Sequence, residues 1–348
     1  MRAEATGRNV TMGGFGRSVV KLLPGLFFAA ALFAQKPPLE FLNHNRGVLD
    51  AHNCYPYEGR FQDRLDRALG TGFPIGIEQD LAWYVDSASG AGRIAVTHQA
   101  ETTGAEPGLR DYFFEHVRPI VEKALRENDR LRWPLIILHF DFKSNQPPLL
   151  KAVWDLLGEY EGWITTARQT ADPHQLAPFD PKPILVLTED SDAQEQVFFR
   201  QVPVGAKLRV FGSAHTAKLP GSTDQERAHY AATLAPNKIL TERPTNYRRW
   251  WNNPWREVEE GGQEKAGDWT AADEKRLRAL VQHAHRRGFW IRFYTLDGFP
   301  ENDEHGWSSG YNFGSLDRAR ARWRAAIAEG VDLIATDQYE DLAREMTR

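Results

Sequence analysis

GIEQDL, residues 76–81, places two carboxylates, Glu78 and Asp80, at the end of a short run of residues that favours a β-strand. Similar β-rich apolar runs recur along the chain, and stretches with helical periodicity lie between them. Strands and helices that alternate eight times are typical of a (β/α)8 barrel. The predicted strands are residues 47–52, 74–80, 135–141, 184–189, 207–212, 237–241, 290–295 and 332–337. The sequence therefore predicts an α/β fold, a TIM barrel that forms a single domain over residues 37–348.

The helical pattern is clear in four segments, which are residues 109–127, 148–159, 272–287 and 315–329. Two features fit the barrel less well. Residues 162–168, GWITTAR, could form a ninth strand, and little helical periodicity follows the fifth and sixth predicted strands before residue 270. The Pro-rich residues 173–183 are interpreted as a loop rather than a domain linker, because a strand of the same barrel follows them.

The first 34 residues have the layout of a secretory signal peptide. Arg17 and Lys21 precede an apolar run from Leu22 to Phe33, which is short for a membrane span and is interrupted by Pro and Gly. We therefore expect that residues 1–34 are removed, that no stable membrane span remains, and that the protein is secreted or periplasmic. An uncleaved membrane anchor is the alternative.

The composition argues against several classes of function. The chain has 348 residues and a formal net charge of −4, and no segment concentrates basic residues, so we do not expect binding to nucleic acid. The single cysteine, Cys54, cannot form an internal disulfide and cannot build a cysteine-rich zinc site. The sequence does not indicate an oligomeric state.

Polar residues of three predicted strands fall on faces that should point into the barrel. Side chains alternate along a strand, so Glu78 and Asp80 share one face with Gly76. The corresponding positions of the third strand are His139, Asp141 and Lys143, and the first strand ends with Asp50, His52 and Asn53. Because neighbouring strands lie about 4.8 Å apart, these side chains should converge at the mouth of the barrel. His139, deeper in its strand, is expected to be a hydrogen-bonded core residue.

Carboxylates that converge in this way need a compensating charge. Two of them about 4 Å apart repel by roughly 4 kcal/mol at an effective dielectric constant of about 20, so three would not all remain ionised alone. Oxygen ligands favour Mg²⁺ or Ca²⁺ over zinc, and we expect Glu78, Asp80 and Asp141 to bind one such divalent cation. The alternative is structural pairing, in which Lys143 or Arg292 neutralises Asp141 or Glu78.

Six motifs resemble those of a known superfamily. They are LDAHN, GIEQDL, IAVTHQ, LHFDFKS, IRFYTLDG and LIATD, in this order, and they extend from about residue 48 to residue 342. Together they resemble the glycerophosphodiester phosphodiesterase and phosphatidylinositol-specific phospholipase C superfamily of PLC-like phosphodiesterases. They are most similar to its secreted bacterial branch, in which the first motif contains His-Asn rather than His-Arg.

The resemblance implies a role for each matching residue. By position, the paired catalytic histidines are His52 and His98, and the metal ligands are Glu78, Asp80 and Asp141. Lys143 matches the lysine that faces the substrate phosphate, and Asn53, Arg292 and Tyr294 complete the expected substrate-binding set. Asn53 replaces the Arg that binds phosphate in typical members, and Tyr294 stands where the family often has Trp. Thr336–Asp337 match the closing Thr-Asp motif.

The function that we expect is metal-dependent hydrolysis of a phosphodiester. The cation and Lys143 would neutralise the phosphate. One of the two histidines, His52 and His98, would act as general base and the other as general acid, and neutral imidazole suits both roles near pH 7. The resemblance implies a glycerophosphodiester-like or phosphoinositide-like substrate, which is a small molecule or is derived from a lipid.

Two other functions are compatible with the sequence. A secreted glycoside hydrolase would use a carboxylate pair drawn from Glu189, Glu242 and Asp297, and the tryptophans of residues 248–255 would stack on sugars together with Trp307. A carbohydrate-binding or lipid-binding barrel without turnover is the third function. Metal-dependent turnover separates the first from the second, and binding without turnover would support the third.

Overall fold

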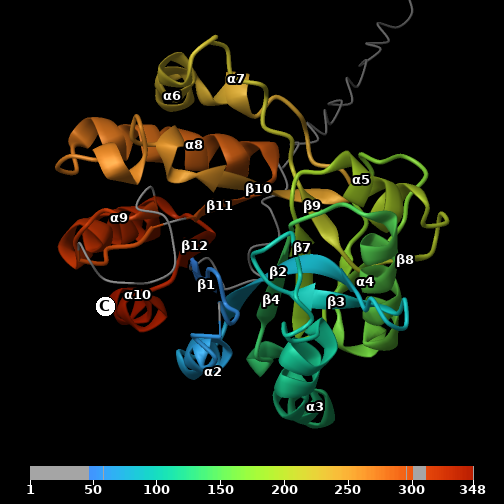
Figure 1. The fold of residues 1–348 in the computed structure, drawn as a ribbon. Helices are drawn as coiled ribbons and strands as arrows, with labels where there is room; N and C mark the ends of the chain where they lie inside the picture. Colours follow the sequence, from blue (N-terminus) through green and yellow to red (C-terminus); the bar gives the residue numbers. More distant parts are fainter. Residues whose placement is uncertain (1–46, 58, 295, 301–310, 348) are drawn as a thin grey trace, which may run out of the picture. The chain divides into compact units, whose positions relative to one another are not determined.

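The fold is a (β/α)8 barrel, as the sequence predicts, in a computed structural model that describes residues 47–57, 59–294, 296–300 and 311–347. Eight parallel strands form a closed ring, and helices lie outside it (Figure 1). The barrel strands are β1 (Val48–Ala51), β2 (Ile75–Val85), β4 (Ile136–Phe142), β7 (Ile184–Thr188), β9 (Phe211–Ser213), β10 (Arg248–Pro254), β11 (Trp290–Tyr294) and β12 (Leu333–Thr336). The expected signal peptide, residues 1–34, and Trp307 lie outside the described residues.

The ring closes through β1, which pairs on both of its edges. Leu49 lies opposite Ile334 of β12 and opposite Ile75 of β2, and both pairings are parallel. The other barrel strands follow one another around the ring in chain order. Because all eight run in the same direction, their carboxyl ends meet at one mouth, where the loops that follow them can build a site.

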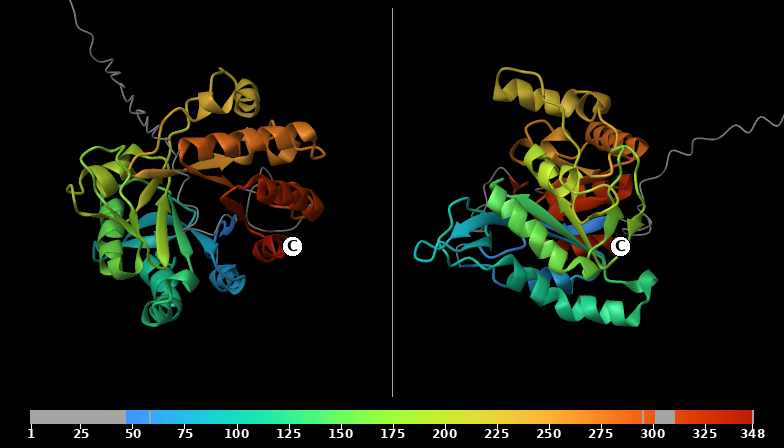
Figure 2. Two further views of the ribbon diagram at one scale, coloured as in Figure 1. Left: turned by 180° about the vertical axis from the view of Figure 1, so that it is seen from behind. Right: turned by 90° about the vertical axis from the view of Figure 1, so that its right-hand side faces the viewer.

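The outer layer consists of helices that connect successive strands (Figures 1 and 2). Its main helices are α2 (Arg64–Gly70), α3 (His116–Glu127), α4 (Pro147–Glu159), α8 (Ala271–Arg287), α9 (Leu316–Glu329) and α10 (Tyr339–Met346). The shorter ones are α5 (Asp192–Glu195), α6 (Asp224–Thr233) and α7 (Pro236–Ile239), with the π-helical segments η1 (Arg110–Glu115) and η4 (Gln196–Arg200). Single-turn helices are η2 (Arg130–Arg132), η3 (Glu161–Trp163), η5 (Trp255–Glu257) and η6 (Gln263–Lys265). In the described residues, no helix is both long and apolar enough to cross a bilayer.

Local sequence signals fix the ends of the longest helix. Thr270 and Asp273 form a capping box at the start of α8, in which each side chain accepts a hydrogen bond from the other residue's backbone N–H. Gly288 ends the helix in the left-handed conformation with φ 93°, which glycine adopts without steric strain. The apolar side of α8 is buried in the core, so capping and packing favour the same segment.

The predicted position of the sixth strand is wrong. Residues 237–241 were expected to be β-structure, but Pro236–Ile239 form the short helix α7, and the sixth strand is β10. Pro236 favours the helix because the fixed φ of proline suits a first helical turn, where its missing N–H is not needed. The sequence of β10, RRWWNNP, does not resemble an apolar run because several of its buried side chains are polar.

Two other predictions are corrected by a separate three-stranded sheet. Of the predicted fifth strand, residues 207–212, only the end joins the barrel in β9, whereas β8 (Lys207–Leu208) pairs with β5 (Thr166–Arg168). β5 lies within the ninth strand considered for residues 162–168, and it also pairs with β6 (Phe179–Asp180). This small sheet is not part of the ring.

Aromatic packing fills the end of the barrel opposite to the mouth. The ring of Phe179, from the small sheet, lies parallel to that of Trp290, the first residue of β11, with 5.9 Å between the ring centroids. Phe179 also meets Phe211 of β9 edge to face at 4.9 Å. The apolar end of the barrel therefore contributes to the stability of the fold, and the polar mouth carries the residues of the site.

β2 is longer than predicted and continues beyond the ring as one arm of a hairpin. Its last residues pair antiparallel with β3 (Gly92–Val96), and His98 follows β3 after a single residue. The backbone N–H of Thr97 donates to the carbonyl oxygen of Asp80, which fixes the return of the hairpin to the barrel. His98 is thus carried to the mouth by a hairpin.

Candidate active site

Three carboxylates converge at the mouth of the barrel. One oxygen atom from each of Glu78, Asp80 and Asp141 lies within 4.8 Å of the others. Glu78 and Asp80 on β2 are buried, and the side chain of Asp141 on β4 is 34% exposed. β2 and β4 pair so that Asp80 is opposite Asp141, which explains why residues distant in sequence meet here. The predicted convergence of these three residues is confirmed.

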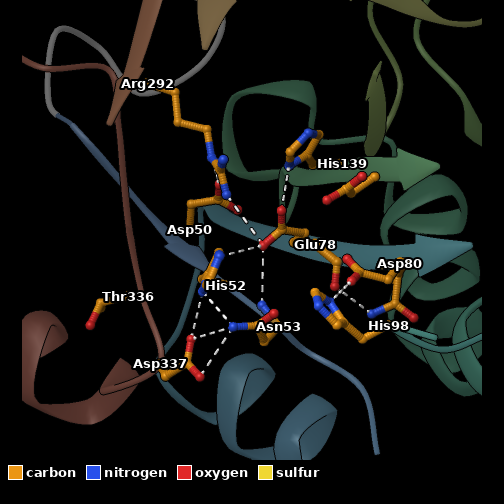
Figure 3. A network of polar contacts seen from close by, with 12 residues as sticks. Asp50, His52, Asn53, Glu78, Asp80, His98, His139, Arg292, Thr336 and Asp337 are labelled. Atoms are coloured by element: carbon orange, nitrogen blue, oxygen red, sulfur yellow. Dashed lines mark hydrogen bonds and ion pairs between the residues drawn. The ribbon is translucent and has the colours of Figure 1, made fainter. Parts of the chain in front are cut away.

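Glu78 is surrounded by groups that favour its ionised form. Its Oε2 atom accepts a hydrogen bond from the backbone N–H of Asn53 at 3.1 Å and lies 3.4 Å from Nη2 of Arg292 (Figure 3). His52 Nε2 is 3.5 Å from Oε2, and His139 Nδ1 is 3.6 Å from Oε1. Burial alone would raise the pKa of Glu78, but the positive charges of His52 and Arg292 outweigh it and hold this pKa well below its usual range.

Asp80 accepts hydrogen bonds from three side chains at the mouth. Its Oδ2 atom lies 2.7 Å from Nζ of Lys143, 2.7 Å from Nδ1 of His98 and 2.7 Å from the hydroxyl oxygen of Tyr55. Nζ of Lys143 also donates to Oδ2 of Asp141 at 2.7 Å. Burial and the negative charge of Asp80 raise the pKa of Asp141 to about 6, against the opposing effect of Lys143.

His52 is oriented by Asp337, the residue after β12. Its Nδ1 atom lies 2.7 Å from Oδ1 of Asp337, and because a carboxylate only accepts, we assign the proton to Nδ1. Asp337 is itself held by Nδ2 of Asn53 at 3.1 Å and by Nη2 of Arg64 at 3.3 Å. Burial disfavours the imidazolium, but the charges of Glu78 and Asp337 outweigh this and raise the pKa of His52 to about 9.

His98 has the same kind of support and a different exposure. Asp80 accepts from its Nδ1, as Asp337 does from that of His52. The side chain of His98 is 42% exposed, whereas that of His52 is 9% exposed. The network therefore holds two histidines through their Nδ1 atoms, one in the interior and one at the surface of the mouth (Figure 3).

The predicted substrate-binding residues fall into two groups. Lys143 and Tyr294 are partly exposed, and the ring of Tyr294 stacks over that of His52 with 6.5 Å between centroids. Asn53 and Arg292 are buried and bind other residues of the site. Asn53 adopts a left-handed conformation with φ 51°, which directs its N–H to Glu78 and its side chain to Asp337.

Arg292 and Asp50 form an ion pair in the interior, under the three carboxylates. The side chain of Arg292 is 1% exposed, and its Nη1 atom donates to Asn252 at 3.1 Å. Gly76 makes this pair possible, because a Cβ atom at that position would collide with the carboxylate of Asp50. The pairing of Arg292 with Glu78 and of Lys143 with Asp141, the structural alternative raised by the sequence, is therefore present.

Several residues of the network were not identified from the sequence. Tyr55 and Arg64 lie in a loop and a helix with no motif, and each acts through a partner distant in the chain. Asp337 belongs to the closing Thr-Asp motif, but the motif does not reveal that it binds His52. His139, expected to be a core residue, is buried and donates to Glu189 at 2.7 Å.

The tryptophans of residues 248–255 do not support sugar binding. Trp250, Trp251 and Trp255 have no exposed surface, so the prediction that they stack on sugars is wrong. The three candidate acids of a glycosidase also have internal partners: Glu189 accepts from His139 and Asn252, Glu242 from the backbone N–H of His215, and Asp297 from Thr336 and the backbone N–H of Asp337.

The residues at the mouth fit a hard divalent cation. Three carboxylates from two paired strands supply only oxygen donors, and these are the ligands that Mg²⁺ and Ca²⁺ prefer. Two further groups in the described part of the chain bring such ligand atoms together. One contains His52, Asp297 and Asp337, and the other contains Asp192, Glu195 and His215. In the second, Nη2 of Arg248 lies 2.8 Å from Glu195, so a side-chain cation already lies beside this group.

Comparisons with known proteins do not assign the chain to a family. No family model matches it, and no curated protein matches it significantly. Solved structures that resemble it include Plasmodium falciparum HPPK-DHPS, wild type with STZ-DHP, at 11% identity and a TM-score of 0.43, covering 88% of this chain and 48% of that chain. The wild-type enzyme from the same organism with pteroate gives 11% identity and a TM-score of 0.37, covering 88% and 47%.

An HPPK-DHPS crystal structure in complex with substrates gives 13% identity and a TM-score of 0.41, covering 88% of this chain and 49% of that chain. This chain thus spans about half the length of the proteins it resembles. Similarity at this level carries no argument about function, which has to come from the site itself.

Proposed function

We propose that the protein is a metal-dependent phosphodiesterase. One observation carries the proposal: His52 and His98 are each held through Nδ1 by a carboxylate, next to three carboxylates that can share a divalent cation. This combination suits the hydrolysis of a phosphodiester, in which charge is neutralised on the phosphate while one proton is removed from the nucleophile and another is given to the leaving group. The resemblance of the motifs to PLC-like phosphodiesterases supports the same reaction.

A divalent cation bound by Glu78, Asp80 and Asp141 would withdraw charge from a non-bridging oxygen of the phosphate. The protein's own residues supply the rest. Lys143 adds positive charge at the same mouth, and a positioned pair of histidines typically contributes about 10²–10⁴-fold per group. Asp337 holds His52 in one orientation through Nδ1, which is a positioning role. Assays of the two histidine variants on substrates with different leaving groups would show which histidine is the acid.

The partly exposed residues and the motifs support one class of substrate. Tyr294 stacks against His52 at the mouth, and we propose that it contacts the alcohol portion of the substrate. Together with the motif resemblance, this supports a glycerophosphodiester or a phosphoinositide-like diester as substrate. The expected export of the protein is consistent with a substrate outside the cytoplasm.

The test is a panel of phosphodiesters assayed after treatment with EDTA and again with added Ca²⁺ or Mg²⁺. Glycerophosphodiesters, phosphatidylinositol and bis(p-nitrophenyl) phosphate belong in the panel, and ³¹P NMR distinguishes a monoester from a cyclic product. We expect turnover only with a divalent cation. Equal turnover in EDTA would remove the cation from the mechanism, and turnover of glycosides alone would favour a glycoside hydrolase.

A further inference from the structure

The position of Lys143 relative to the three carboxylates is the starting point. Its Nζ atom lies 2.7 Å from Oδ2 of Asp80 and 2.7 Å from Oδ2 of Asp141, so it bridges two of the three candidate metal ligands. The third, Glu78, is paired separately with Arg292 at 3.4 Å. Lys143 is thus the positively charged side chain that pairs with both Asp80 and Asp141.

A lysine whose only role is to bind a substrate phosphate would not need to bridge two carboxylates of the protein. The side chain of Lys143 is 17% exposed, and two of the three ammonium protons are directed at carboxylates of the protein. Both carboxylates accept from the same ammonium group, so Lys143 supplies a positive charge between them. The oxygen atoms that it contacts are the ones that a divalent cation would need.

We propose that Lys143 is a built-in counter-ion that competes with the divalent cation for Asp80 and Asp141 and thereby lowers the affinity of the site. This inference rests on the cation site of the proposed function and adds how that site is regulated. Two positive charges close to the same carboxylates repel each other, whether Lys143 is displaced or only shifted. Without a cation, Lys143 prevents the repulsion between Asp80 and Asp141 from opening the mouth.

The test compares cation binding in the wild-type protein and in three variants of it. Lys143→Met removes the charge and keeps most of the stem, and Lys143→Arg keeps the charge. Lys151→Met is the matched control, because Lys151 on α4 also pairs with an aspartate but is 74% exposed. Calorimetric titration with Ca²⁺ and Mg²⁺ after EDTA treatment gives the affinities, and the melting temperature with and without cation gives a second readout.

We expect Lys143→Met to bind the cation at least about 10-fold more tightly than the wild type, whereas Lys143→Arg and Lys151→Met differ little from it. In EDTA, Lys143→Met should melt at a lower temperature than the wild type, and the cation should raise its melting temperature more. The double variant with Lys143→Met and Glu78→Gln should bind the cation at least about 10-fold more weakly than Lys143→Met alone. That result would place the cation at this site.

Equal or weaker binding by Lys143→Met would overturn the inference, and so would the absence of binding in both proteins. Binding by Lys143→Met alone would support it, since the lysine would then replace the cation in the wild type. None of these results depends on a substrate. A wild-type protein that binds the cation but hydrolyses no phosphodiester would contradict the proposed function and leave the role of Lys143 intact.

Discussion

The hydroxyl group of Tyr55 lies 2.7 Å from Oδ2 of Asp80, to which Nδ1 of His98 is also bound at 2.7 Å. The same hydroxyl oxygen is 2.7 Å from Oδ1 of Asn53, whose Nδ2 contacts Asp337, the partner of His52. Tyr55 therefore connects the supports of the two histidines. One side chain outside every motif links the two halves of the site.

Tyr55→Phe removes this link and should lower kcat by about 10-fold, because Asp80 and His98 lose a fixed neighbour. In a His98→Ala background, the same change should have a smaller further effect, since only the link through Asn53 to the support of His52 then remains to be lost. Tyr57→Phe is the control, because the ring of Tyr57 is edge-on to His98 at 6.5 Å and its hydroxyl contacts Gln99. Losses that simply multiply in the double variant would show that Tyr55 does not act through His98.

Asp337→Asn should lower kcat by at least about 10²-fold with a small change in KM, because Nδ1 of His52 loses its charged acceptor. The variant keeps the shape of the side chain, so steady-state kinetics reports on charge and orientation. Asp341→Asn on α10 is the control, because its carboxylate pairs with surface arginines away from the site. An unchanged kcat in Asp337→Asn would remove Asp337 from the support of His52.

Glu257 makes stability depend on pH. Burial raises its pKa from 4.5 to about 8, against the opposing charges of Arg276 and Arg256, and its Oε2 atom has no hydrogen-bond partner among the described residues. Between these two pKa values the folded protein holds a proton that the unfolded chain releases. The free energy of unfolding should therefore fall as pH rises through this range.

Glu257→Gln should remove this dependence because it mimics the protonated acid. Relative to the wild type, the variant should gain more than about 1 kcal/mol of unfolding free energy between about pH 5 and pH 8. Urea unfolding at both pH values measures the difference. Parallel pH profiles for the two proteins would show that Glu257 does not carry the effect.

The alternation of side chains along strands explains what the sequence could reveal. Glu78 and Asp80 lie two residues apart in a predicted strand, so alternation alone places them on one face. Asp141 occupies the corresponding position of the neighbouring strand. The cluster of three carboxylates could therefore be predicted from the sequence. β10 was missed because polar interior residues such as Asn252 serve the site rather than the core. The contacts of Tyr55 and Arg64 depend on how a loop and a helix pack against the barrel. Local sequence patterns do not predict this packing.

Export of the protein is a separate prediction from the basic start and apolar run of residues 1–34. N-terminal sequencing of protein recovered from its native host should show the loss of about the first 30–35 residues. An intact terminus at Met1 or Met12 in cytoplasmic protein would contradict export.

The most direct test of the proposed phosphodiesterase is kcat for His52→Ala and His98→Ala in the presence of Ca²⁺ or Mg²⁺. His116→Ala is the control, because His116 on α3 pairs with the exposed Asp66. On a glycerophosphodiester and on bis(p-nitrophenyl) phosphate, we expect each site variant to lose at least about 10²-fold with little change in melting temperature. The defect of whichever histidine is the acid should be milder with nitrophenolate, which leaves without a proton. Full activity in either site variant would contradict the paired-histidine mechanism.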